Sequence, residues 1–135
     1  MTMEAITGGC ACGTVRYEVT APFESASYCH CHRCQRRTGT AWSINARIAP
    51  EHFRITAGEE AVRTWAPEGG FPKSFCSLCG SALFSGGGEL PVGVRMGTLD
   101  GDPGVRPSYR QWLESAPAWE TVPDDGLTRY PRARG

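Results

Sequence analysis

Residues 8–17 have the sequence GGCACGTVRY, in which a Cys-x-Cys pair is followed directly by Gly13. Two more cysteine clusters occur downstream, CHCHRC at residues 29–34 and CSLC at residues 76–79, and Gly80 follows the last one. A glycine at these points lets the backbone turn tightly where a Cβ would crowd it. Closely spaced cysteines on tight turns are typical zinc ligands.

Zinc explains the spacing of all seven cysteines better than disulfide bonds do. The number of cysteines is odd, the N-terminus resembles no secretion signal, and Cys-x-Cys pairs are poor partners for unstrained disulfides. The set that would form a closed, structural four-thiolate site is Cys10, Cys12, Cys76 and Cys79. The set that would leave one coordination position free for chemistry is Cys29, Cys31 and Cys34. The sequence therefore predicts one zinc for folding and one for catalysis.

Histidines and arginines surround the three-cysteine cluster. Either His30 or His32 could be a further ligand, although an extended backbone would point His30 away from the neighbouring sulfurs. Arg33, Arg36 and Arg37 are either a solvated charged turn or a site that offsets thiolate charge and binds the carboxylates of an anionic ligand.

Composition indicates a single domain over residues 1–135, with flexible ends at about 1–5 and 130–135. Fourteen basic residues balance fourteen acidic ones, which disfavours nucleic acid as a partner. No run approaches the roughly 20 apolar residues of a membrane span, so we expect a cytoplasmic protein that does not bind membranes. Leu, Ile, Val and Phe contribute 22 residues, roughly 16%, which predicts a thin core that needs support from metal sites.

Period-two alternation dominates the chain and predicts an all-β or mainly β fold with few short helical turns. The expected strands are residues 15–19, 42–48, 53–55, 62–66, 82–85 and 90–96, with a hairpin loop at 86–88. Short helices are possible only at 31–37 and 108–115. Trp112 and Trp119 are interpreted as packing anchors rather than as a ligand platform.

The motifs resemble those of the glutathione-dependent formaldehyde-activating enzyme family, which includes the centromere protein V domain. The resemblance rests on GGCACGTVRY, on CHCHRC followed by Thr38-Gly39, on FCSLCGS at residues 75–81, and on GTLD at residues 97–100. It extends through Pro107 and Trp119 to Asp125-Gly126-Leu127, and so covers essentially the whole chain. The resemblance implies an Mss4-like β-tent with zinc-clipped hairpins, and the same division of the cysteines into a structural and a catalytic zinc site.

The implied activity is that of a carbon–sulfur lyase acting on a thiol adduct such as S-hydroxymethylglutathione, with glutathione and formaldehyde or another carbonyl compound as its small-molecule partners. Arg33, Arg36 and Arg37 would then hold the glutathione carboxylates. Two other functions stay open at this point. One is a non-catalytic zinc-binding interaction module, and the other is a sensor in which oxidation of zinc-bound thiols releases the metal.

Overall fold

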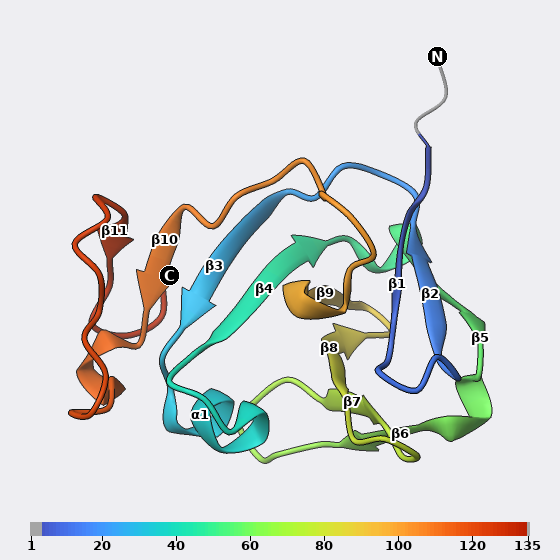
Figure 1. Cartoon of the computed structure of the whole chain (residues 1–135), viewed down its shortest axis with the longest axis horizontal. Helices are drawn as coiled ribbons and strands as arrows, with labels where there is room; N and C mark the ends of the chain where they lie inside the picture. Colours follow the sequence, from blue (N-terminus) through green and yellow to red (C-terminus); the bar gives the residue numbers. More distant parts are fainter. Residues whose placement is uncertain (1–3, 135) are drawn as a thin grey trace.

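The chain is mainly β, as the computed structural model shows for residues 4–134, the part that it describes (Figure 1). One α-helix, α1 (His32–Thr38), and four short 3-10 turns accompany the strands in this part of the chain. The strands are β1 (Ile6–Gly9), β2 (Arg16–Val19), β3 (Ser25–Cys29), β4 (Ser43–Ile48), β5 (Phe53–Ala57), β6 (Val62–Trp65), β7 (Lys73–Cys76), β8 (Ala82–Gly87), β9 (Leu90–Arg95), β10 (Tyr109–Gln111) and β11 (Thr128–Arg129). The predicted mainly β fold class is confirmed.

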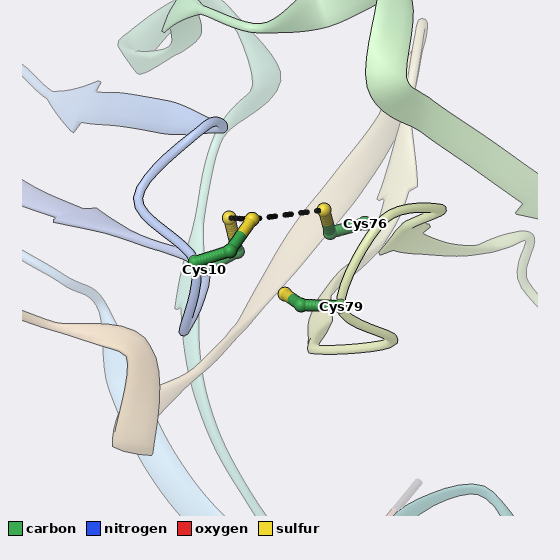
Figure 2. Close-up of side chains that lie close together, drawn as sticks. Cys10, Cys76 and Cys79 are labelled. Carbon is green, nitrogen blue, oxygen red and sulfur yellow. Dashed lines mark hydrogen bonds between the residues drawn. The ribbon is translucent and has the colours of Figure 1, made fainter.

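Two sheets organise the strands. The smaller has the order β1-β2-β5, and the larger has the order β11-β10-β3-β4-β9-β8-β7-β6. Neighbouring strands are antiparallel except that β10 runs parallel to both β3 and β11. The turn between β1 and β2 faces the turn between β7 and β8, which brings the first and last cysteine clusters together (Figure 2).

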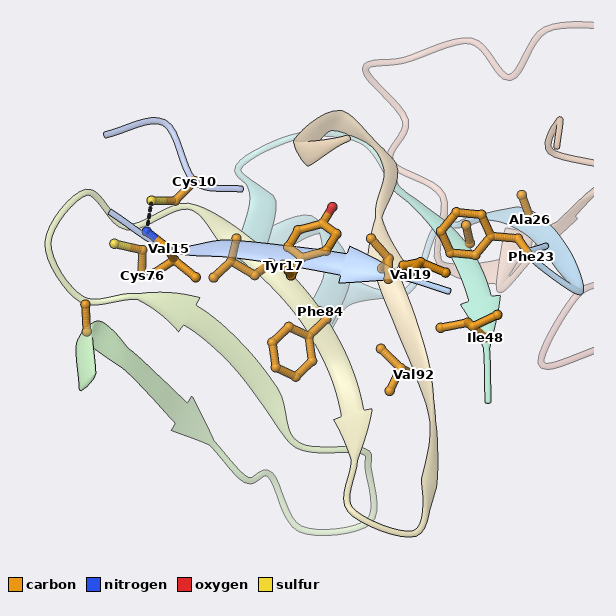
Figure 3. Packing of buried hydrophobic residues seen from close by; sticks show 14 residues of the cluster. Cys10, Val15, Tyr17, Val19, Phe23, Ala26, Ile48, Cys76, Phe84 and Val92 are labelled. Atoms are coloured by element: carbon orange, nitrogen blue, oxygen red, sulfur yellow. Dashed lines mark hydrogen bonds between the residues drawn. The ribbon is translucent and has the colours of Figure 1, made fainter. Parts of the chain in front are cut away.

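The hydrophobic core lies between the small sheet and one face of the large sheet (Figure 3). Alternate residues of β2 point into it, so that Tyr17 and Val19 are almost fully buried. The rings of Tyr17 and Phe53 lie 5.3 Å apart, and those of Phe53 and Phe84 lie 4.7 Å apart, which continues the aromatic packing from one sheet to the other. On the side of the core that the large sheet forms, Ala46 and Val94 are completely buried.

Most of the predicted strands are confirmed, with small differences at their ends. Strand β8 continues through Gly87, so the hairpin loop is shorter than the predicted 86–88 and is formed by Gly88 and Glu89. Five strands carried too weak a pattern to be predicted, namely β1, β3, β7, β10 and β11. The helix at 31–37 is confirmed as α1.

The possible helix at 108–115 is wrong, because this segment forms β10 and a short 3-10 turn. Its backbone pairs with β3 and β11, and these partners are distant in the sequence. Residues 130–134, predicted to be a flexible end, also take part in this region: the Tyr130 amide donates to the Arg110 carbonyl, and the Trp112 amide donates to the Arg132 carbonyl. Residues 1–3 and 135, also within the predicted flexible ends, lie outside the described residues.

None of the helices in residues 4–134 has the length and apolar character that a membrane span requires.

We expect Gly86→Ala to destabilise the β8–β9 hairpin much more than Gly88→Ala does. Both glycines have a positive φ, 78° and 65°, so alanine should cost about 1–2 kcal/mol at either position. A Cβ at Gly86 would also overlap the carbonyl oxygen of Pro91, whereas one at Gly88 would point into open space. Urea unfolding of both variants measures the difference, and equal losses of unfolding free energy would contradict the argument.

Candidate functional site

The first candidate metal site lies where the two cysteine-bearing turns meet. Its four sulfurs, from Cys10, Cys12, Cys76 and Cys79, all lie within 4.8 Å of one another (Figure 2). The Sγ atom of Cys12 is 3.6 Å from that of Cys10 and 3.9 Å from that of Cys76. Four sulfurs at about 2.3 Å from a tetrahedral zinc ion would be separated by about 3.8 Å. The cluster therefore has the dimensions and the donor set that fit zinc.

Polar groups around this cluster favour thiolate ligands. The Val15 amide donates a hydrogen bond to the Cys10 sulfur at 3.2 Å. The side chain and backbone of Ser81 lower the pKa of Cys79 to about 5, since they hydrogen-bond to its sulfur. Hydrogen bonds to the charged form stabilise it, and zinc requires that form.

The second candidate metal site is formed by Cys29, Cys31 and Cys34, whose sulfurs also lie within 4.8 Å of one another. Cys29 ends β3, Cys31 caps the N-terminus of α1, and Cys34 lies in the first turn of that helix. The Cys34 amide donates to the Cys31 sulfur at 3.3 Å, so the local geometry of the helix start positions these two ligands. Gly39, with φ 66°, ends the helix and donates to the Gln35 carbonyl.

The three thiols are coupled by hydrogen bonds. Donation from Cys29, Cys31 and Ser43, together with the charge of Arg95, lowers the pKa of Cys34 to about 2. The same sharing raises the pKa of Cys29. These hydrogen bonds therefore favour the thiolate form of Cys34.

His30 is not part of the candidate ligand group formed by Cys29, Cys31 and Cys34. Its side chain is fully buried, and its Nε2 lies 3.3 Å from Nη1 of Arg110. The Arg110 guanidinium lies 4.0 Å from the Tyr28 ring and donates to the Asp125 carboxylate at 2.8 Å. This buried cluster supports the chain behind Cys29 and Cys31. His32 is exposed and lies on the other side, at the edge of a cleft.

All three cysteines of the second group line that cleft, which has a volume of about 1190 Å³. Its floor is the face of the large sheet that points away from the core. Directly opposed residues of neighbouring strands share a face, and one such row is Trp65, Lys73, Ser85, Gly93, Arg47 and Ser25. Cationic side chains outnumber the one acidic side chain, Glu24, which pairs with Arg47. The cationic residues of the lining are Arg33, Arg47, Lys73 and Arg134. The cleft therefore suits an anionic ligand beside the three sulfurs.

Of the three predicted arginines, Arg33 lines the cleft, while Arg36 and Arg37 do not. The Arg33 guanidinium lies 6.0 Å from the Trp65 ring and against Gly70. Arg36 is exposed at the helix surface. Arg37 points its Nη1 into the protein, where that nitrogen is buried without a partner among the described residues.

Lys73 and Trp112 are cleft residues that the sequence did not identify. Trp112 is the single non-glycine residue with a positive φ, 59°, in residues 4–134, and it borders the cleft next to Gln111. A bulky residue in this region of φ and ψ is strained, and such strain clusters at functional sites. The interpretation of Trp119 as a packing anchor is wrong, because that side chain is 71% exposed. Trp112 is half-buried, so its interpretation as a packing anchor stays a prediction.

The chain is similar to known proteins in sequence and in fold. The family described as glutathione-dependent formaldehyde-activating enzyme matches residues 5–115. A crystal structure of a Rhodobacter sphaeroides protein is similar with a TM-score of 0.60 and 23% identity, over 92% of this chain and 98% of that one. At this identity the likeness shows a shared fold. No curated protein matches the chain significantly.

We expect the purified protein to contain two zinc ions per chain, and a chelator to remove the zinc held by Cys29, Cys31 and Cys34 first. That group supplies three sulfurs and borders the open cleft, whereas the other group supplies four sulfurs. Elemental analysis during a chelator titration measures both ions. A protein without zinc, in which thiol titration finds fewer than seven free thiols, would contradict this prediction.

Proposed function

The chain belongs to the glutathione-dependent formaldehyde-activating enzyme family, and on that premise we propose that it is a zinc-dependent enzyme of the carbon–sulfur lyase type. Its reaction would join the thiol of glutathione, or of a similar small anionic thiol, to formaldehyde or another carbonyl compound. The reverse reaction would cleave the same adduct, of which S-hydroxymethylglutathione is the simplest.

The observation that carries this proposal is the position of Cys29, Cys31 and Cys34 in the wall of a large cationic cleft. These residues would hold a zinc ion with three thiolates and leave its fourth position facing the cleft. Zinc in such a site acts as a Lewis acid and stabilises a thiol in its thiolate form. In contrast, the cluster at Cys10 and Cys76 has four sulfurs, which supports a structural role for its metal.

The remaining cleft residues would bind and orient the thiol compound. Arg33 and Arg134 can each form charge-assisted hydrogen bonds with carboxylates, and glutathione carries two of them. Arg134 is held in place because its guanidinium lies 4.7 Å from the Tyr109 ring. Trp112 offers an apolar surface in the same wall. Arg36 and Arg37, which do not line the cleft, have no place in this binding scheme.

The buried side of the site would keep the sulfurs in place. The His30 amide donates to the Gln111 carbonyl at 3.0 Å, and the Gln35 side chain donates to the His30 carbonyl at 2.8 Å. These bonds fix the backbone between Cys29 and Cys31 to β10 and to α1. Such support keeps the ligand set in one geometry and avoids reorganisation during the reaction.

We expect the zinc-loaded protein to accelerate formation of S-hydroxymethylglutathione from glutathione and formaldehyde. Exchange NMR spectroscopy measures the rate, with the uncatalysed reaction subtracted. Cys31→Ser should lose at least about 10²-fold of this acceleration, because one ligand of the open site is removed. A fully zinc-loaded protein that neither accelerates the reaction with formaldehyde nor acts on other thiol–carbonyl adducts would contradict the proposal and favour an interaction module.

We expect substitutions in the two cysteine groups to have opposite effects on folding. Zinc in a structural site contributes about 10–16 kcal/mol, comparable to the whole stability of a domain. The Cys76 and Cys79 turn is joined there to a turn 64 residues earlier in the chain, so Cys79→Ser should abolish cooperative thermal unfolding. Cys31→Ser should leave a folded protein with one zinc ion. Circular dichroism and zinc analysis measure both outcomes, and equal loss of folding would contradict the division of roles.

A further inference from the structure

Lys73 is the only lysine in a chain that has thirteen arginines. It begins β7 and lines the same cleft as Cys29, Cys31 and Cys34. The next residue in the strand, Ser74, is buried on the opposite face. Because side chains alternate along a strand, the ammonium group of Lys73 projects toward the cleft rather than into the core.

The register of the large sheet places Lys73 on β7, the strand next to the edge strand β6, on the face that forms the cleft floor. It is paired with Trp65 of β6 on one side and with Ser85 of β8 on the other. Trp65 in turn lies next to Arg33, which comes from α1 above the sheet. Lys73 therefore lies half-buried between β6 and β8, on the face of the sheet that Arg33 of α1 approaches.

Among residues 4–134, no acidic side chain forms an ion pair with the ammonium of Lys73. The charged groups that face it are Arg95 from β9, Arg33 from α1, and the thiols of Cys34 and Cys31. Burial, and then the charge of Arg95, lowers the pKa of Lys73. An unpaired, partly buried ammonium in a ligand cleft is costly for stability, which indicates a use in binding or chemistry.

Arginine and lysine differ in one property that matters here. A guanidinium stays charged at every physiological pH, whereas a lysine in such surroundings can give up its proton and regain it. All thirteen remaining Lys/Arg positions are arginine, and the one lysine, Lys73, lies in the cleft that the three sulfurs line. The cleft therefore contains a basic residue that is capable of proton transfer. Addition of a thiolate to a carbonyl group needs such a proton, because the carbonyl oxygen becomes negatively charged.

We propose, resting on the function proposed above, that Lys73 is the general acid–base catalyst of carbon–sulfur bond formation. As the thiolate sulfur bonds to the carbonyl carbon, the π electron pair moves onto oxygen, and that oxygen takes a proton from Nζ of Lys73. The neutral amine regains a proton from water, which balances the one released when the thiol ionised. In the reverse direction, the amine removes the hydroxyl proton while the carbon–sulfur bond breaks and the carbonyl group reforms.

Two substitutions separate proton transfer from simple charge. Lys73→Arg keeps the positive charge but cannot transfer a proton, and Lys73→Met removes both properties. We expect both to lower kcat for S-hydroxymethylglutathione formation by about 10²–10⁴-fold, with the zinc content unchanged and the melting temperature no lower than that of the wild type. Arg63→Met, on the neighbouring strand β6 and outside the cleft, is the matched control and should keep full activity. Full activity of Lys73→Arg would overturn the proton-transfer role while leaving the proposed function intact; an inactive wild-type protein would overturn both.

A second experiment measures the pKa of the Lys73 side chain directly. Because the chain has one lysine, labelling with [15N]lysine should give a single side-chain resonance, whose titration reports the pKa of this group alone. We expect that pKa to lie below the ordinary value of about 10.4, and kcat for adduct formation to fall as the pH rises through it, since the ammonium is then lost. This alkaline fall should disappear in Lys73→Arg. A titration at the ordinary pKa, with a rate that does not follow it, would overturn the proposal.

Discussion

The convergence of two cysteine-bearing turns is the constraint on which the rest of the structure depends. The Cys12 sulfur lies 3.9 Å from that of Cys76, although the two residues are 64 positions apart. The first turn joins β1 to β2 in the small sheet, and the second joins β7 to β8 near one edge of the large sheet. Contact between the two turns therefore fixes how the sheets face each other. The apolar core between them is built mostly from small and medium-sized side chains, with Phe53 and Phe84 as its aromatic centre. A metal ion between the turns, as we propose, would supply the stability that such a core lacks.

Once the sheets are held in this way, the outer face of the large sheet becomes the floor of the cleft. The alternation in β4 predicted a strand with an apolar and a polar face, and the structure confirms both faces. The alternation could not show what lies over the polar face. Helix α1 lies there, so Ser43 is buried, while Arg47 remains exposed at the edge of the cleft, where it pairs with Glu24. Strand β3 was not predicted for the same reason. Its serines resemble an exposed loop in the sequence, but two alternate residues of the strand, Ser27 and Cys29, are buried beneath the cleft.

The cysteine groups could be predicted because their spacing is encoded locally, within turns and one short helix. Residues such as Lys73 and Trp112 could not, since they reach the site through strand pairing between distant segments. Trp112 also depends on a positive φ that sequence patterns do not signal at a tryptophan. For Lys73 a compositional signal existed, namely its uniqueness among fourteen basic residues. Arg33 and Arg36 are three residues apart on α1, and only Arg33 lines the cleft, because it lies at the end of the helix that borders the cleft; the sequence spacing did not distinguish the two.

The use of arginine and lysine around the site follows from their chemistry. Arg110 is buried behind the cysteines, where its planar guanidinium stacks on Tyr28 and pairs with Asp125. A planar guanidinium suits that position, because it can stack on a ring and hydrogen-bond to a carboxylate at the same time. Arg95 donates hydrogen bonds to the Asn45 side chain and the Gly93 carbonyl beneath the cleft. Its charge contributes to the lowered pKa of Cys34 and to that of Lys73, so it favours a thiolate and at the same time favours proton release from the lysine. The same electrostatic arrangement that holds an anionic thiol in the cleft thus makes its one lysine the group best suited to exchange a proton there.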